Sequence, residues 1–323
     1  MIRPPALGPG ARVALVAPAG PLAEGAVDRA ERRVREWGWE PVVGNHVRGR
    51  HGYLAAPDAE RAADFNAALR DPSVDAVWCL RGGYGTMRIL DDLDWDALAA
   101  RPRPVIGFSD ITAVHLAIQR LGIVSFHGPH PATVDVTDYS RGGLLRTLTE
   151  PGPAGELPFP DGAPPPETIA GGVAEGRLVG GNLSLVAATL GTPYAVRPEG
   201  AILFLEEVGE AAYRVDRLLS QLRLAGVLES VAGVVLGAFT ETPDAGNADV
   251  PHVTEVLRDR LGDLGVPVAA GFPFGHVDDN WTLPVGARAR LDADAGRLEL
   301  LEAAVAVRDG GGKHDARETE QPR

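Results

Sequence analysis

The chain has 323 residues, 45% of them hydrophobic, which is enough to bury one or two cores and excludes global disorder. Its formal net charge of −13 argues against nucleic acid or an anionic membrane as a partner, because both reward clustered Lys and Arg. The single cysteine, Cys79, allows no internal disulfide and no cysteine-rich metal site. The N-terminus lacks a signal-like apolar core, and no run of about 18 apolar residues is present, so we expect a soluble cytoplasmic protein.

The first half of the chain alternates between strand and helix patterns. Strands are predicted at 12–18, 41–43, 74–80 and 105–108, and helices at 23–37, 58–69, 87–90 and 111–121. Asp58 is expected to cap the second of these helices. Such alternation is typical of an α/β fold with a doubly wound, mostly parallel sheet, in which ligands lie beyond the carboxyl ends of the strands.

The composition changes near residue 150. Residues 151–167 are rich in Pro and Gly, so we interpret them as a linker without regular structure. After it, strands are predicted at 175–179, 201–205 and 233–236, helices at 183–190, 212–224 and 253–261, and β-rich segments to about 307. The predicted organisation is an N-terminal domain at 1–150, the linker at 151–167, a smaller β-rich α/β domain at 168–307 and a disordered tail at 308–323, with the active site between the domains.

The segment Gly107-Phe108-Ser109-Asp110 joins a predicted strand to a predicted helix. A strand that turns sharply into a helix displays a serine hydroxyl and aims helix N–H groups at whatever the hydroxyl attacks. A Ser-Asp pair before an apolar helix is also an ordinary N-cap. A nucleophile therefore requires that the rest of the chain supply partners for Ser109.

The loop Arg81-Gly82-Gly83-Tyr84-Gly85-Thr86 follows the buried strand at 74–80. Its glycines let the backbone bend tightly and present N–H groups to an anion. The anion is either a nucleotide phosphate, as in a kinase, or the negative oxygen of a tetrahedral intermediate held jointly with the N–H of Asp110. A plain tight turn is the third interpretation.

Two further segments carry candidate partners for the serine. Glu206 and Glu207 follow a buried strand, where a carboxylate can orient a histidine, and because side chains alternate along a strand only one of them can serve. His276 ends the Gly/Pro-framed loop that starts at Gly271 and is poorly explained as a core residue. His127 and His130 form a second pair with metal-like spacing, but no further ligand cluster supports a metal.

Taken together, these segments resemble the LD-carboxypeptidase family of serine peptidases, which also contains the microcin C self-immunity peptidases. The resemblance covers about residues 10 to 305, in the family's order. It rests on Val13–Pro18, Arg81–Gly85, Gly107–Asp110, Phe126–Pro129, Gly180–Leu183, Leu205–Glu207, Tyr213–Arg217, Gly275–His276 and Thr282–Pro284.

The resemblance implies a Ser-Glu-His triad in chain order, with Ser109 as nucleophile, Glu206 as orienting carboxylate and His276 as general base and acid. The family usually has Glu-Asp where this chain has Glu206-Glu207, and its first position is catalytic. It also implies oxyanion donors at the backbone N–H groups of Gly83 and Asp110, no cofactor, and a homodimer.

The implied substrate is a small cell-wall peptide, a muropeptide, whose terminal L,D bond is cut to release D-alanine during peptidoglycan recycling. Arg81, Tyr84 and Arg214 are the candidate substrate-binding residues. Arg81, Arg88 or Arg214 can bind the terminal carboxylate by a bidentate pair, and the sequence does not choose among them.

Alternatives remain open at this point. Within the family, a microcin-type immunity peptidase would cleave peptidyl or aminoacyl nucleotides; the absence of tryptophan at 178–190 and the pattern at 213–217 favour the cell-wall branch. From other classes, a nucleotide-binding kinase built on 82–86 is disfavoured because Tyr84 occupies the usual acidic place. A non-catalytic ligand-binding protein on a two-domain scaffold is the third alternative.

Overall fold

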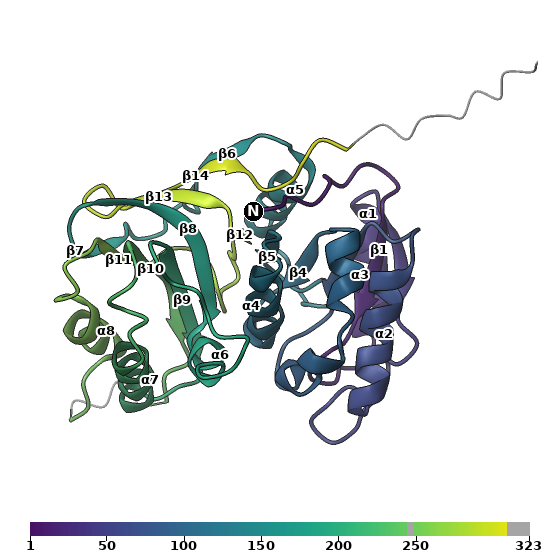
Figure 1. Ribbon diagram of the computed structural model, residues 1–323, viewed down its shortest axis with the longest axis horizontal. Helices are drawn as coiled ribbons and strands as arrows, with labels where there is room; N and C mark the ends of the chain where they lie inside the picture. The colour runs from purple at the N-terminus through teal and green to yellow at the C-terminus, as the bar shows by residue number, and fades with distance from the viewer. Residues whose placement is uncertain (244–248, 309–323) are drawn as a thin grey trace, which may run out of the picture.

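A six-stranded sheet, built mostly by the first half of the chain, forms one lobe of the molecule (Figure 1). The structure is a computed structural model that describes residues 1–243 and 249–308. In sheet order the strands are β12 (Leu283–Val285), β5 (Ser125–His127), β4 (Val105–Gly107), β3 (Ala76–Cys79), β1 (Arg12–Val16) and β2 (Glu40–Val43). Every neighbouring pair is parallel except β12 with β5. The predicted parallel, doubly wound sheet is therefore confirmed.

Helices cover both faces of this sheet, as burial of its strands requires. Val13 and Leu15 of β1 pack toward one helical layer, and Ala14 and Val16 toward the other, because side chains alternate along a strand. The first layer is α1 (Ala26–Glu36) and α5 (Asp138–Thr149), and the second is α2 (Asp58–Arg70), α3 (Trp95–Ala100) and α4 (Thr112–Arg120). Cys79 is fully buried in β3, as predicted.

The second lobe is an eight-stranded mixed sheet. In sheet order its strands are β6 (Pro153–Glu156), β14 (Arg297–Ala303), β13 (Arg288–Asp292), β8 (Val173–Asn182), β9 (Ile202–Val208), β10 (Gly233–Thr240), β11 (Val268–Ala270) and β7 (Glu167–Ala170). The central strands from β8 to β11 are parallel, and the outer pairings are antiparallel. Three helices, α6 (Leu183–Ala188), α7 (Ala212–Leu224) and α8 (Val253–Leu261), pack on one face of this sheet.

Two local predictions were wrong. The interval 151–167 has regular structure at β6, which pairs with β14, because a Pro-containing segment is tolerated at a sheet edge. Asp58 does not cap α2: Pro57 occupies the N-cap position, and the Asp58 carboxylate binds Arg61 and Arg88 instead. The predicted tail at 308–323 lies outside the described residues, apart from Arg308.

One buried arginine fixes the loops at the carboxyl edge of the first sheet. The guanidinium of Arg61, on α2, donates hydrogen bonds to the backbone oxygens of Pro18, Ala56 and Gly85. Its side chain is 1% exposed, so these bonds and the ion pair with Asp58 replace its hydration. Through its bond to Gly85, Arg61 therefore holds the loop at residues 81–86, called the glycine loop below, in place.

None of the helices in the described part of the chain is long and apolar enough to cross a membrane.

Candidate active site

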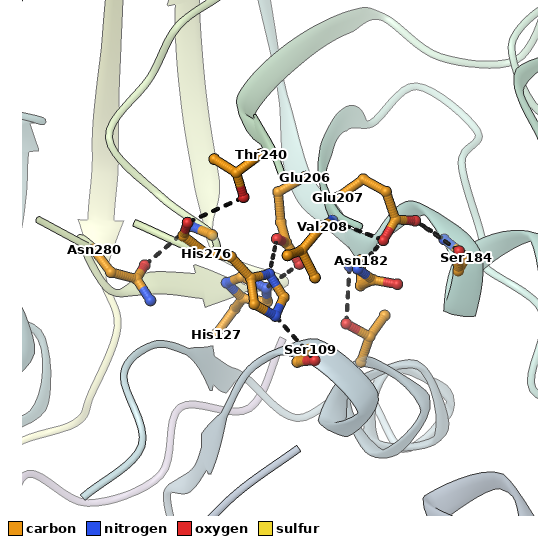
Figure 2. A network of polar contacts seen from close by, with 12 residues as sticks. Ser109, His127, Asn182, Ser184, Glu206, Glu207, Val208, Thr240, His276 and Asn280 are labelled. Carbon is orange, nitrogen blue, oxygen red and sulfur yellow. Dashed lines mark hydrogen bonds and ion pairs between the residues drawn. The ribbon is translucent and has the colours of Figure 1, made fainter. Parts of the chain in front are cut away.

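Ser109 lies on a strained turn at the carboxyl end of β4. Its φ of 62° is in the left-handed region, which a residue with a side chain adopts at a cost of about 1–3 kcal/mol. A short 3₁₀ helix, Ser109–Ile111, leads directly into α4, and no side chain caps either helix. The N-cap interpretation of Ser109 therefore does not describe this turn, which instead presents the hydroxyl toward the second lobe (Figure 2).

Three side chains from distant parts of the sequence form one hydrogen-bonded chain (Figure 2). Ser109 Oγ lies 3.2 Å from His276 Nε2, and His276 Nδ1 lies 2.7 Å from Glu206 Oε2. In the tautomer that suits both contacts, Nδ1–H donates to the carboxylate and Nε2 accepts from the serine hydroxyl. The sequence-predicted trio is brought together across the two lobes.

His276 is held by the loop that carries it. Gly275 N donates to Asn280 Oδ1 at 3.1 Å, and Thr240 Oγ1 donates to the His276 carbonyl at 3.3 Å. Gly275 has φ +105°, and a Cβ there would lie 2.7 Å from Glu206 Cβ, so only glycine lets this loop approach the carboxylate. The Phe108 ring packs 4.8 Å from the imidazole and limits its rotation.

Glu206 and Glu207 point to opposite faces of β9, as the alternation rule requires. Both carboxylate oxygens of Glu207 accept hydrogen bonds away from the Ser109 hydroxyl. The donors are Asn182 Nδ2 (2.9 Å), Val208 N (2.9 Å), Ser184 N (2.8 Å) and Ser184 Oγ (2.7 Å). Burial raises the pKa of the Glu207 carboxyl, and these donors oppose the rise. Glu207 is thus an anchor for the start of α6, and Glu206 faces the histidine.

Glu206 lies between two imidazoles. Its Oε2 accepts from His276, and its Oε1 is 3.9 Å from His127 Nε2, which is too long for a hydrogen bond but close enough for an ion pair. Both side chains at this second contact are 0% exposed. Burial alone raises the pKa of the Glu206 carboxyl, but His127 and His276 outweigh it and lower the pKa to about 2. The carboxylate therefore stays ionised beside the histidine.

Two more buried histidines, His115 and His130, lie in the same lobe as Ser109. His115 makes contacts of 2.9 Å with Ser125 Oγ and 2.8 Å with the Gly107 carbonyl, and His130 Nδ1 lies 2.8 Å from the Cys79 carbonyl. Burial lowers the pKa of each to about 3, so both rings are neutral. No group of three or more metal-ligating side chains occurs among residues 1–243 and 249–308, and the pair His127 and His130 is divided between two different contacts.

The glycine loop packs directly against the serine turn. A Cβ added at Gly82 would lie 2.8 Å from Ser109 Cβ and 3.3 Å from the Asp110 backbone nitrogen, so the loop and the turn touch through bare backbone. The Asp110 carboxylate, 1% exposed, accepts from Thr86 N at 2.8 Å and from Thr86 Oγ1 at 2.9 Å. Burial is the main cause of a raised pKa at Asp110, and the Thr86 bonds oppose it. This clasp keeps Gly83 and Asp110, the predicted oxyanion donors, on adjoining segments.

The arginines predicted as carboxylate ligands differ in what they already bind. Arg88 is engaged by Asp58, with contacts of 3.0, 3.0 and 2.7 Å. Arg214 is 3.1 Å from Tyr213 Oη and 3.5 Å from Glu210. Arg81 donates only to the Pro21 carbonyl, at 2.5 Å, among the described contacts. Arg81 is thus the candidate whose charge is least neutralised.

Tyr84, the remaining substrate-binding candidate, stands on the exposed side of the glycine loop. It is 50% exposed, and its ring packs against that of Tyr53, 65% exposed, with 5.6 Å between the centroids. Sequence reasoning missed Tyr53, the Asp110–Thr86 clasp and the contact of His127 with Glu206. The paired glycines marked this loop, but no local pattern indicates which side chains meet it from elsewhere in the fold.

Comparisons with known proteins agree with this geometry. Residues 13–128 match the model of the LD-carboxypeptidase N-terminal domain, and residues 175–291 match that of the C-terminal domain. A Streptomyces coelicolor protein that bears the name of a carboxypeptidase is 46% identical over 94% of this chain and 98% of its own length. The solved muramoyltetrapeptide carboxypeptidase of Oxalobacter formigenes is 34% identical, with a TM-score of 0.77 over 90% of this chain and 97% of that one.

The microcin branch is also related to this chain. The microcin C7 self-immunity protein of Escherichia coli is 28% identical over 88% of this chain and 91% of its own length. The two domain models together span the serine turn, the glycine loop, the glutamates and His276. The chain belongs to the LD-carboxypeptidase family and is a serine carboxypeptidase.

Proposed function

We propose that this enzyme hydrolyses the terminal L,D peptide bond of a cell-wall tetrapeptide and releases D-alanine. The observation that carries the proposal is the continuous contact from Ser109 Oγ through His276 to Glu206, at 3.2 and 2.7 Å. Its support from relatives is the carboxypeptidase of Oxalobacter formigenes, whose name specifies a muramoyltetrapeptide. The cytoplasmic location and the homodimer expected of the family belong to the same proposal.

The first half of the proposed reaction forms an acyl-enzyme. Ser109 Oγ attacks the scissile carbonyl while its proton passes to His276 Nε2. Glu206 holds the Nδ1–H tautomer and stabilises the imidazolium that results. The negative oxygen of the tetrahedral intermediate accepts from the backbone N–H groups of Gly83 and Asp110. His276 then gives its proton to the nitrogen of D-alanine, the C–N bond breaks, and the peptide remains esterified to Ser109.

The second half returns the enzyme to its starting state. A water molecule takes the place of the departed amine and loses a proton to His276 Nε2 as its oxygen attacks the ester carbonyl. The same oxyanion donors hold the second tetrahedral intermediate. When it collapses, Ser109 Oγ leaves and recovers its proton from His276. The products are free D-alanine and a tripeptide with a new carboxylate, and no cofactor enters the balance.

The second candidate is cleavage of an aminoacyl or peptidyl nucleotide, favoured by the similarity to the microcin C7 self-immunity protein. The exposed aromatic pair Tyr53–Tyr84 offers a surface for stacking of the nucleotide base. Because the chain is a serine carboxypeptidase, a kinase on the glycine loop and a non-catalytic binding protein are set aside.

Parallel digests decide between the two substrates. Purified protein is incubated with a tetrapeptide muropeptide and, separately, with an aminoacyl sulfamoyl adenylate, and both digests are followed by mass spectrometry. We expect the tetrapeptide to lose one alanine at a rate at least ~10-fold above cleavage of the adenylate. Preferential cleavage of the adenylate would assign the enzyme to the microcin branch instead.

A further inference from the structure

A cavity of about 240 Å³ lies at the carboxyl edge of the first sheet, outside the Ser109–His276–Glu206 chain. Its walls come from the segments that follow β1, β3 and β5 and from the first turn of α1. This is the edge at which ligands bind in doubly wound sheets. At this volume the cavity is smaller than the roughly 300–1,000 Å³ of sites for drug-sized ligands, so a single small residue suits it better.

Two of its wall residues connect the cavity to the reactive serine. Arg81 is joined directly to Gly82, whose backbone touches Ser109. His130 stacks on Phe108, the neighbour of Ser109, with 4.6 Å between the ring centroids. Phe108 in turn packs 4.8 Å from His276. The cavity therefore lies next to residues that contact the serine turn, and Arg81 joins its wall to the glycine loop at 81–86.

The cavity carries positive charge that no described acid neutralises. Arg29 donates only to the Ala132 carbonyl, at 3.3 and 3.2 Å, and Arg81 only to the Pro21 carbonyl; within 1–243 and 249–308 neither guanidinium contacts a carboxylate. The N-terminal end of α1 adds the positive end of its helix dipole. No side chain caps it, and Asp28 in its first turn pairs with Arg48. What distinguishes Arg29 and Arg81 is that both line the same cavity, where two guanidinium groups without a carboxylate partner suit an anion.

A buried histidine also forms part of the cavity wall. His130 lines it, is 6% exposed, and makes a 2.8 Å contact from Nδ1 to the Cys79 carbonyl, so Nδ1 carries the proton. Its Nε2 has no hydrogen-bond partner among the described residues. This nitrogen is enclosed by protein, so the ring contributes shape to the wall and no ligand contact. Apart from Thr133, the remaining wall is apolar, formed in part by Leu22, Ala26 and Leu80.

We propose that this cavity is the subsite for the substrate's C-terminal residue, with Arg81 as the ligand of its terminal carboxylate and Arg29 as the second positive charge. The proposal rests on the proposed carboxypeptidase activity and deepens it. The methyl group of that residue lies on the apolar part of the wall. Arg88 and Arg214 are excluded as primary ligands, because Asp58 occupies the first and Tyr213 and Glu210 hold the second.

The test measures binding without turnover, in a Ser109→Ala background. Isothermal titration calorimetry compares a tetrapeptide that ends in a free carboxylate with the same peptide ending in a carboxamide. We expect the acid to bind roughly 10- to 100-fold more tightly, the range for a charge-assisted bidentate pair. Adding Arg81→Ala removes most of this preference, and Arg81→Lys, which keeps the charge but loses the fork, retains part of it.

Arg70→Ala is the matched control, because Arg70 is an exposed arginine on α2 that pairs with Asp94. It leaves the preference for the acid unchanged, and thermal melting confirms that each variant is folded. The proposal is overturned if Arg81→Ala keeps the full preference, or if Arg88→Ala or Arg214→Ala removes it instead. Turnover of the tetrapeptide by the wild-type enzyme is measured separately. Absence of turnover contradicts the proposed function, whereas turnover with an unchanged preference in Arg81→Ala contradicts only the assignment of the subsite.

Discussion

The two lobes hold their parts of the active site by different means. The first lobe fixes Ser109 through local backbone geometry: a left-handed serine at φ 62°, the bare glycine loop against it, and a clasp from Asp110 to Thr86. The second lobe fixes Glu206 and His276 through long-range contacts between the end of β9 and the loop after β11. The serine turn and the glycine loop were each predicted from consecutive residues, whereas the clasp and the contacts of the second lobe exist only in the folded protein.

This difference predicts how each half fails. Apart from loss of the Ser109 hydroxyl itself, changes in the first lobe alter the shape of the backbone around Ser109, and they act through crowding. Changes in the second lobe remove a proton acceptor or an orienting charge, and they act through chemistry while the fold persists. Substitutions that change only backbone shape, or only a charge, therefore test this difference between the two lobes.

The largest effect is expected at His276. His276→Ala removes the group that accepts the proton of Ser109, and loss of one member of a cooperating triad lowers kcat by about 10⁴-fold or more. Because the ring is only partly buried, at 21% exposure, we expect the melting temperature to stay close to that of the wild type. Steady-state release of D-alanine measures the effect. A variant with more than a tenth of normal kcat contradicts the assigned role.

The adjacent glutamates give a matched pair within the second lobe. Glu206→Gln removes the charge that fixes the His276 tautomer, and we expect kcat to fall about 10³-fold with little change in KM. Glu207→Gln turns an amide toward donors that need an acceptor, so it costs about 1–3 kcal/mol of stability and leaves kcat within several-fold. Kinetics and denaturant unfolding of both variants check this, and the opposite pattern would exchange their roles.

A third prediction concerns crowding in the first lobe. Gly82→Ala places a methyl group 2.8 Å from Ser109 Cβ, which forces the loop or the turn to move, and we expect kcat to fall about 10²-fold. Gly142→Ala is the control: it lies in α5 with no atom within 4 Å of the added Cβ. The control keeps full activity and gains about 1 kcal/mol of stability. Equal kinetics for both variants would mean that the loop does not constrain Ser109.

The smallest effect is a pH dependence of stability from the buried histidines. Burial holds the pKa of His115 and His130 at about 3 in the folded protein, whereas an unfolded histidine titrates near 6.5. Below about pH 6.5 these histidines bind protons in the unfolded chain but not in the folded protein, so the free energy of unfolding falls as the pH falls. Each ring contributes about 1.4 kcal/mol per pH unit.

Denaturant unfolding between pH 7 and 5 measures this slope, and that window lies above the range in which most carboxylates titrate. His115→Gln removes one of the two rings, so we expect it to reduce the slope. A stability that stays flat over the window would contradict the neutral state assigned to both rings.

The sequence predicted the central elements because their patterns are local. Residues 212–224 and 253–261 begin and end where the helical periodicity indicated, and the serine turn followed from a strand, a glycine and a helix in succession. The strands β5 (Ser-Phe-His) and β6 (Pro-Ala-Gly-Glu) contain no apolar run of their own, and β12 joins the first sheet from a distant part of the chain. No local pattern specifies such a pairing.

The residues of the active site also differ in whether the sequence alone could identify them. Resemblance to the family placed Ser109, Glu206 and His276 by position, and alternation along β9 predicted that only one glutamate faces the histidine. The choice among Arg81, Arg88 and Arg214 depended on which acid each guanidinium meets in space, such as Asp58 at Arg88. Periodicity and motif spacing carry no information on such partners.

The most direct test of Ser109 as the nucleophile compares wild-type protein with Ser109→Ala on one substrate. Both are incubated with a purified tetrapeptide muropeptide, and the released D-alanine and shortened peptide are quantified by mass spectrometry. We predict steady release by the wild type and a loss of ~10⁴-fold or more in the variant. Release by Ser109→Ala at a rate near that of the wild type would show that this hydroxyl is not the nucleophile.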